Sequence, residues 1–257
     1  MCRFIETVKL ENGNYKLINY HNKRLNDTII RFFKKTPLKS EFIDIGKFLP
    51  SPAAEFKNGI FKCRIVYSDK IESIEILPYI KKNIKRLKLV ESDIDYSLKF
   101  ENRDSINNLF EESKIFKNKN RLNLPANLIN DNTNNSDSNS NSNSNDNKNS
   151  RASDSLCRTC NLYDDNNTRD SNFDILIVKN GLITDTSYSN IILYDGKEWV
   201  TPESFLLNGV KRQHLLNKCI IKEMKVRTVD LKNFKKISLI NAMLEPRDIE
   251  IDINDII

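Results

Sequence analysis

The stretch DILIVKNGLITDTSYSNIILYDGKEWVTPESFLLNGVKRQHLL, residues 174–216, decides the fold of this chain. It opens with an apolar run of strand length at 174–178, and the turn residue Gly181 then sends the chain back. A second pair of short apolar runs brackets Asp195-Gly196, a strong hairpin signal. The segment closes with helical spacing of apolar residues from Gly209 to Ile221. Hairpins followed directly by a helix predict a mixed α+β architecture.

The rest of the chain alternates strands and helices in the same way. Apolar residues recur at helical spacing in some segments, and β-forming residues bounded by turn signals mark others. We expect strands at 3–9, 60–67, 71–77, 87–90, 224–229 and 237–240, and helices at 21–33, 40–48 and 103–116. Because both kinds of element occur in each half, we expect two α+β lobes, residues 1–80 and 88–257.

A polar block interrupts the second lobe at about residues 118–172. It is dominated by Asn, Ser and Asp, including SDSNSNSNSNDNKNS at 136–150. Such a composition buries too little apolar surface to offset the entropy lost on ordering, so we expect a disordered insert. The block also contains Cys157 and Cys160 in a C-x-x-C arrangement. One such pair without a second pair or a nearby His is weak evidence for zinc, and no metal site is predicted.

Composition excludes several classes of function. Of the 257 residues, 39% are hydrophobic and 30% are charged, with a net charge of +6. Lysines occur singly or in pairs and are not interleaved with aromatic residues, so no nucleic-acid surface is expected. No segment is apolar enough for a membrane span or a signal peptide, and five cysteines do not form a disulfide framework. We therefore expect a cytoplasmic protein, whose mildly basic charge reflects a solvated surface or a cleft for an anionic small molecule.

The motifs of residues 174–216 resemble those of the class IV aminotransferases, the fold-type IV enzymes that use pyridoxal 5′-phosphate (PLP). That family includes branched-chain aminotransferase, D-amino-acid aminotransferase and aminodeoxychorismate lyase. Its pattern is a Gly turn, an acidic residue, an Asn before a strand, a Thr-Pro and a Leu-x-Gly helix start. The matching residues follow in that order: Gly181, Asp185, Ser189-Asn190, Thr201-Pro202 and Leu207–Arg212. The resemblance implies a two-lobed PLP-enzyme fold.

Two upstream motifs extend the resemblance. Residues 21–25, HNKRL, are similar to the family's H-x-x-R-L helix, and Lys99–Arg103, KFENR, to the K-x-x-N-R stretch that carries the Schiff-base lysine. Lys99 and Asp185 lie 86 positions apart, and removing the polar block restores the family's spacing.

The resemblance implies a role for each matching residue. Lys99 would form the Schiff base and then act as general acid and base, although a solvated surface lysine is the plain alternative. Asp185 would pair with the pyridine nitrogen, a place where the family normally has Glu; a turn residue capping its own backbone is the alternative. Arg24 would reach the phosphate, unless it is only a helix-surface arginine.

Other implied contacts come from backbone and loops. Gly209, Val210 and Lys211 would offer N–H groups to the phosphate at a helix amino terminus, and the ammonium of Lys211 would replace the family's Thr hydroxyl. Asn190 would help to bind the cofactor, and Asn241 and Ala242 match the loop that closes over it. Arg64 is a candidate for binding a substrate carboxylate, with a sheet-surface arginine nearly as plausible.

Three functions stay open at this stage. The Asn241-Ala242 loop favours aminodeoxychorismate lyase, which eliminates pyruvate from 4-amino-4-deoxychorismate to give 4-aminobenzoate for folate biosynthesis. An aminotransferase acting on an amino acid and a 2-oxo acid is the close alternative. Asp185 and Lys211 depart from the family's pattern and keep a catalytically silent binding protein open. The resemblance also implies a homodimer with a small-molecule amino substrate.

Overall fold

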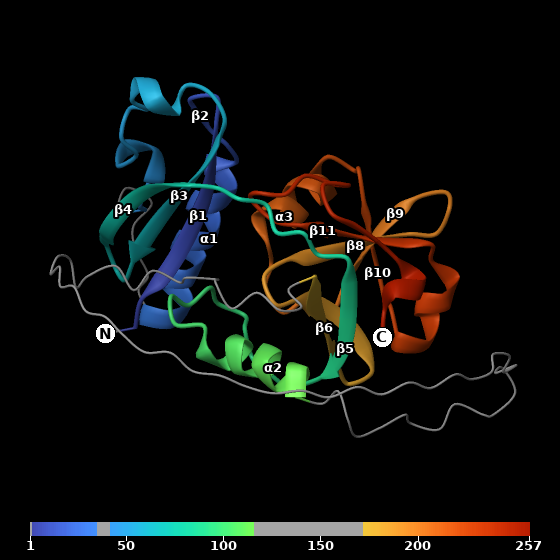
Figure 1. The fold of residues 1–257 in the computed structure, drawn as a ribbon. Helices are drawn as coiled ribbons and strands as arrows, with labels where there is room; N and C mark the ends of the chain where they lie inside the picture. The colour runs from blue at the N-terminus through green and yellow to red at the C-terminus, as the bar shows by residue number, and fades with distance from the viewer. Residues whose placement is uncertain (1, 35–41, 116–171) are drawn as a thin grey trace, which may run out of the picture. The chain divides into compact units, whose positions relative to one another are not determined.

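A computed structural model describes residues 2–34, 42–115 and 172–257 (Figure 1). The predicted insert at 118–172, with Cys157 and Cys160, lies almost wholly outside the described residues. The structure therefore neither supports nor contradicts the disorder predicted there.

The first lobe is built on an antiparallel sheet of four strands in the order β2-β1-β3-β4. The strands are β1 (Phe4–Glu11), β2 (Asn14–Tyr15), β3 (Ile60–Tyr67) and β4 (Ile71–Pro78), and Figure 1 shows the last three of the order side by side. β1 turns into β2 at Asn12-Gly13, where both residues have positive φ angles, 49° and 74°. An Asn-Gly pair suits such a turn because both residues tolerate the left-handed region.

Helix α1 (Ile18–Phe33) covers this sheet. Its buried residues His21, Leu25, Thr28 and Ile29 share one face, as the spacing predicted. The helix expected at 40–48 is wrong for its described part, which holds only the 3-10 turn Ile45–Lys47. Asp44 explains the difference, because its side chain accepts a hydrogen bond from Gly46 N and so closes a tight local turn.

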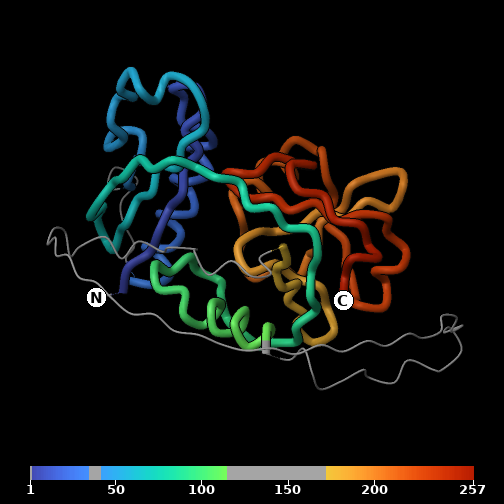
Figure 2. Tube along the Cα trace, viewed as in Figure 1, coloured from blue at the N-terminus to red at the C-terminus, as the bar shows by residue number. Residues whose placement is uncertain are grey.

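Three strands of the second lobe form a separate sheet in the order β5-β6-β7. Strands β5 (Arg86–Glu91) and β6 (Phe173–Lys179) run parallel, and β7 (Leu182–Thr186) returns antiparallel to β6. Helix α2 (Asp104–Ile115) lies between β5 and β6 in the sequence and packs on β6, where Phe110 stacks on Phe173 with ring centroids 5.3 Å apart. Figure 2 follows this path from β5 into the helix.

A five-stranded sheet completes the fold in the order β10-β9-β8-β11-β12. Its strands are β8 (Asn190–Tyr194), β9 (Trp199–Pro202), β10 (Lys222–Met224), β11 (Lys236–Ile240) and β12 (Glu250–Asp252), and helix α3 (Val210–Asn217) joins β9 to β10. The strand expected at 224–229 is wrong in its position, since β10 ends at Met224. The chain then enters the 3-10 turn Thr228–Asn233, which Asp230 starts by accepting a hydrogen bond from the Arg227 N–H.

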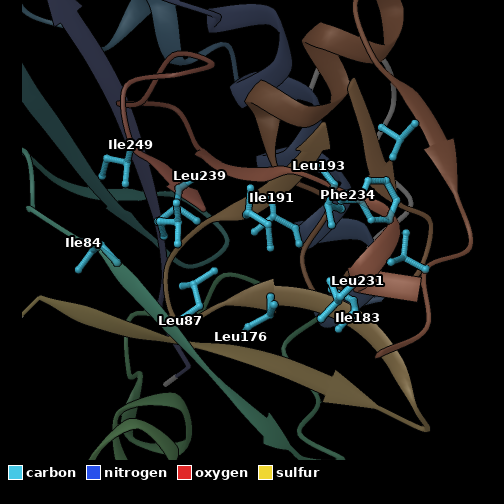
Figure 3. Packing of buried hydrophobic residues seen from close by; sticks show 14 of the residues in the cluster. Ile84, Leu87, Leu176, Ile183, Ile191, Leu193, Leu231, Phe234, Leu239 and Ile249 are labelled. Atoms are coloured by element: carbon cyan, nitrogen blue, oxygen red, sulfur yellow. The ribbon is translucent and has the colours of Figure 1, made fainter. Parts of the chain in front are cut away.

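The main hydrophobic core joins the two sheets of the second lobe. Leu87 of β5, Leu176 of β6 and Leu239 of β11 have no exposed surface and pack in one cluster (Figure 3). Burying side chains of this size contributes roughly 1.5–3 kcal/mol each, so this cluster dominates the stability of the second lobe. It also fixes the ends of β7 and β8, which carry candidate site residues.

The segment before α2 returns to the first lobe. Ile5 N donates to the carbonyl of Lys99 at 3.0 Å, and Glu101 N donates to the carbonyl of Arg3 at 2.9 Å. Leu98 and Phe100 pack against the core of the first lobe. The backbone of Lys99 is therefore anchored at the edge of β1. No helix in the described ranges is long and apolar enough to cross a membrane.

Candidate active site

Most of the site residues predicted from the sequence line one cavity. Its empty volume is about 590 Å³, open solvent at its mouth included. It is lined by residues of α1, of the segment before α2, of the β7–β8 turn and of the start of α3. The predicted site residues that line it are Arg24, Lys99, Asp185, Asn190, Gly209, Val210, Asn241 and Ala242.

Lys99 presents its amine to this cavity from the anchored segment. Its Nζ donates to Thr7 Oγ1 at 3.2 Å. Burial, and then the positive charge of Arg24, lower the pKa of Lys99 from its usual value to about 7. A large fraction of the amine is therefore uncharged at neutral pH, the form in which a lysine acts as a nucleophile or a base.

Arg24 reaches the cavity from α1 and is held by a buried acid. Its Nε and Nη2 donate to the two carboxylate oxygens of Glu6 at 2.8 and 2.6 Å. His21 Nδ1 lies 2.6 Å from the same carboxylate. Burial alone would raise the pKa of Glu6, but Arg24 and His21 outweigh it and hold this pKa well below its usual range. The guanidinium is thus oriented by a charge-assisted fork and is no free helix-surface arginine.

Asp185 lies near the end of β7 with both carboxylate oxygens bonded. Asn190 Nδ2 donates to Oδ1 at 2.8 Å, and the N–H groups of Leu206 and Leu207 donate to Oδ2 at 3.0 and 2.9 Å. Burial raises the pKa of Asp185 to about 6 against these hydrogen bonds. The alternative of a turn residue capping its own backbone does not describe this carboxylate, because its backbone partners belong to the loop before α3.

The amino terminus of α3 opens into the same cavity. Gly209 is the N-cap and no side chain caps the helix, so its first N–H groups are available to an anion. A Cβ at Gly209 would lie 1.9 Å from Asn190 Oδ1, so any other residue there must displace this carboxamide. Asn241 closes the neighbouring loop: its Oδ1 accepts from Met243 N at 2.8 Å, and its Nδ2 donates to Ser189 Oγ at 2.9 Å.

Two predicted site residues lie elsewhere. The ammonium of Lys211 is 2.6 Å from Glu245 Oε1, and Lys211 is not among the residues that line the cavity. Arg64 Nη2 is 2.7 Å from Glu101 Oε1, and this side chain also lies outside the cavity lining. In both cases an acid from a neighbouring segment holds the cation away from the site.

The cavity includes residues that the sequence reasoning gave no role. They are Tyr96, Arg103, Ile106, Thr186–Ser189, Leu206 and Leu207. Arg103 belongs to the KFENR motif, and Ser189 and Leu207 belong to the motifs of residues 174–216, so for these three the motifs were the available signal. Tyr96 follows no pattern that would have marked it. Within the described part of the chain, no group of three or more His, Cys, Asp or Glu side chains could hold a metal ion.

Comparisons with known proteins agree with this geometry. The family described as amino-transferase class IV matches residues 132–250. An uncharacterised protein of Haemophilus influenzae is 27% identical over 244 residues, which cover 95% of this chain and 98% of the relative. A solved structure from Haemophilus somnus, provisionally assigned as a 4-amino-4-deoxychorismate lyase, is 26% identical with a TM-score of 0.67, covering 95% of this chain and 97% of its own.

A more distant structure shares the fold. A Mesorhizobium loti protein provisionally assigned as an amino-acid aminotransferase is 14% identical with a TM-score of 0.60, and both chains are covered completely. The fold and the cavity together define an α+β protein of the fold-type IV class. The predicted resemblance to the class IV aminotransferases is confirmed, both by the family match and by the solved structures.

Proposed function

We propose that this chain is a PLP-dependent enzyme of class IV and that it acts as a 4-amino-4-deoxychorismate lyase. The observation that carries the proposal is the placement of Lys99 and Asp185 on one cavity, together with an uncapped helix terminus. A lysine, an acid and an anion cradle are the three groups that PLP requires of a protein.

The residues present fit that cofactor. Gly209 lets the backbone come close to Asn190, and Gly209 and Val210 offer N–H groups from a helix amino terminus to a phosphate. Arg24 would add a cation to the same phosphate, oriented by Glu6. Asp185 would face the pyridine nitrogen, and Lys99 would hold the cofactor covalently. When bound, PLP would supply an electron sink for the carbanion formed at the substrate.

Lys99 would have a second task while the substrate is bound. Its released amine, with a pKa lowered by burial to about 7, can accept a proton from the carbon next to the substrate nitrogen. The same group, now charged, could return that proton to the methylene carbon of the three-carbon unit as its C–O bond to the ring breaks, so that this unit leaves as pyruvate. Asn241 and Ala242 line the cavity on the side of Ser189, where they would exclude water from these steps.

Two observations favour the lyase over the aminotransferase. The Asn241-Ala242 loop, which resembles the corresponding loop of the lyases, lines the cavity. The Haemophilus somnus structure, which aligns over 95% of this chain, carries a provisional lyase assignment. The aminotransferase reading is the second candidate, supported by the family match and the shared fold of aminotransferase structures.

The decisive experiment offers both substrates to the purified protein. With PLP and 4-amino-4-deoxychorismate, we expect pyruvate and 4-aminobenzoate in equal amounts, and Lys99→Ala should reduce both to background. Borohydride treatment followed by peptide mass mapping should place a pyridoxyl group on Lys99. Amino transfer from glutamate to 2-oxo acids without any pyruvate release would replace the lyase by the aminotransferase. A protein that takes up no PLP at all would fit the silent binding protein.

A further inference from the structure

Arg103 is a cavity residue that neither the cofactor nor the catalytic lysine accounts for. It stands directly before α2, and its side chain lines the cavity beside Tyr96 and Ile106. Its Nη2 donates a hydrogen bond to the carbonyl oxygen of Ser187. This bond holds the guanidinium against the turn between β7 and β8.

Among the described residues, no acid neutralises this arginine. Arg24 is paired with Glu6, and Arg64 with Glu101. Arg103, in contrast, bonds only to neutral groups, the Ser187 carbonyl and the Tyr96 hydroxyl, and its buried Nε has no acceptor. An unpaired buried donor on a charged group is costly, so the arrangement is incomplete until an acceptor enters the cavity.

The neighbours of Arg103 indicate where that acceptor would sit. Its positive charge is one of the causes, after burial and Arg24, that lower the pKa of Lys99. The amine and the guanidinium are therefore close enough to interact. Burial raises the pKa of the Tyr96 hydroxyl, which Arg103 in turn hydrogen-bonds. An anion bound here would lie between a cation and a neutral hydroxyl, next to the reacting amine.

We propose that Arg103 binds a substrate carboxylate in this cavity: that of the three-carbon group released as pyruvate in the lyase, or that of the 2-oxo or 2-amino acid in an aminotransferase. The guanidinium fork matches the geometry of a carboxylate. The amino terminus of α3, which suits a phosphate, is formed by a different part of the lining. The proposal rests on the proposed function for the identity of the substrate, and it assigns to Arg103 the role for which the sequence offered Arg64, which lies outside the cavity lining.

The test measures binding of pyruvate by calorimetry, because pyruvate is a product of the lyase and a substrate of aminotransferases. Acetone, which lacks the carboxylate but keeps the ketone, controls for reaction of the carbonyl with Lys99. We expect Arg103→Gln to weaken pyruvate binding by roughly tenfold or more, as for loss of a hydrogen bond to a charged group. Acetone should bind to wild type and to Arg103→Gln with the same affinity. Arg103→Lys keeps the charge without the fork and should weaken pyruvate binding several-fold.

Two further arms make the outcome decisive. Arg64→Gln should bind pyruvate as the wild type does, and a loss there instead of at Arg103 would overturn the proposal. PLP uptake, measured as the borohydride-stable label on Lys99, should be unchanged in Arg103→Gln; loss of PLP together with pyruvate would make Arg103 a cofactor residue and also overturn it. Should Arg103→Gln not fold, Arg103→Lys decides, and wild-type affinity there contradicts the proposal. A wild type that takes up no PLP ends the proposed function, whereas the pyruvate titration still decides the role of Arg103.

Discussion

Asn190 ties Asp185 to the loop before α3. Its Nδ2 donates to Asp185 Oδ1 and to the Leu207 carbonyl, both at 2.8 Å, and the other carboxylate oxygen accepts from the Leu207 N–H. One carboxamide thus links the end of β7 to the loop that leads into the candidate phosphate cradle. Asp185 and the start of α3 are therefore coupled, and a substitution at either place should shift the other.

The first prediction concerns the charge of Asp185. Because the folded-state pKa is raised from 3.8 to about 6, the folded protein binds more protons than the unfolded chain between these pH values. The contribution of Asp185 to the free energy of unfolding therefore falls as pH rises from about 4 to 6. The isosteric Asp185→Asn lacks this titration, so its free energy of unfolding relative to wild type should rise over that window by up to about 3 kcal/mol. Urea unfolding at several pH values measures it, and a constant difference would contradict the raised pKa.

The second prediction concerns the close approach at Gly209. A Cβ there would lie 1.9 Å from Asn190 Oδ1, so Gly209→Ala must displace the carboxamide that bonds Asp185. We expect a loss of roughly 1–3 kcal/mol in the free energy of unfolding, together with weaker PLP uptake. Gly46→Ala is the matched control, since its nearest neighbour is a side-chain oxygen at 3.3 Å outside the cavity. Equal losses in both variants would show that crowding at Asn190 is not the cause.

The sequence predicted the elements better than their ends. The 21–33 helix and the hairpins of both lobes follow from spacing and turn residues, and the structure confirms them. The expected strand at 224–229 failed because Asp230 bonds the Arg227 N–H and bends the chain, an interaction between side chain and backbone that periodicity does not encode.

In the candidate site, too, some features could be predicted from the sequence and others could not. Motif order brought Lys99, Asp185 and Gly209 to one cavity because such motifs record what the backbone must do there. The pairing of Arg64 with Glu101 and of Lys211 with Glu245 was not predicted, because it depends on segments that are distant in sequence. No spacing rule predicts which distant acid a cation will pair with, and so the partners of these charged residues needed the structure.

The third prediction tests the acid that orients Arg24. Glu6 has no exposed surface, and its loss would leave a buried guanidinium without its partner. Glu6→Gln should therefore destabilise the protein by roughly 3–5 kcal/mol at neutral pH. The pKa of Glu6 is held far below its usual value, so this stabilisation is present above about pH 4.5 and is lost only as pH falls towards the lowered pKa. Thermal unfolding of wild type and variant at pH 7 and in acid measures it, and a variant as stable as wild type at pH 7 would contradict the pairing.

The last prediction concerns Lys99 in the protein without bound cofactor. Its pKa is lowered from 10.5 to about 7, so between these values the unfolded chain holds a proton that the folded protein has released. The free-energy cost of burying the charged amine is therefore largest below pH 7, decreases as pH rises, and is absent above about pH 10.5. Lys99→Met should accordingly be more stable than wild type by roughly 2–4 kcal/mol at pH 6.5, and this advantage should shrink steadily towards pH 10. Lys47→Met, an exposed lysine of the first lobe, controls for replacing an ammonium by a thioether. If Lys99→Met shows no advantage at pH 6.5, or one that grows with pH, then the amine is not held in the low-polarity setting that its proposed chemistry requires.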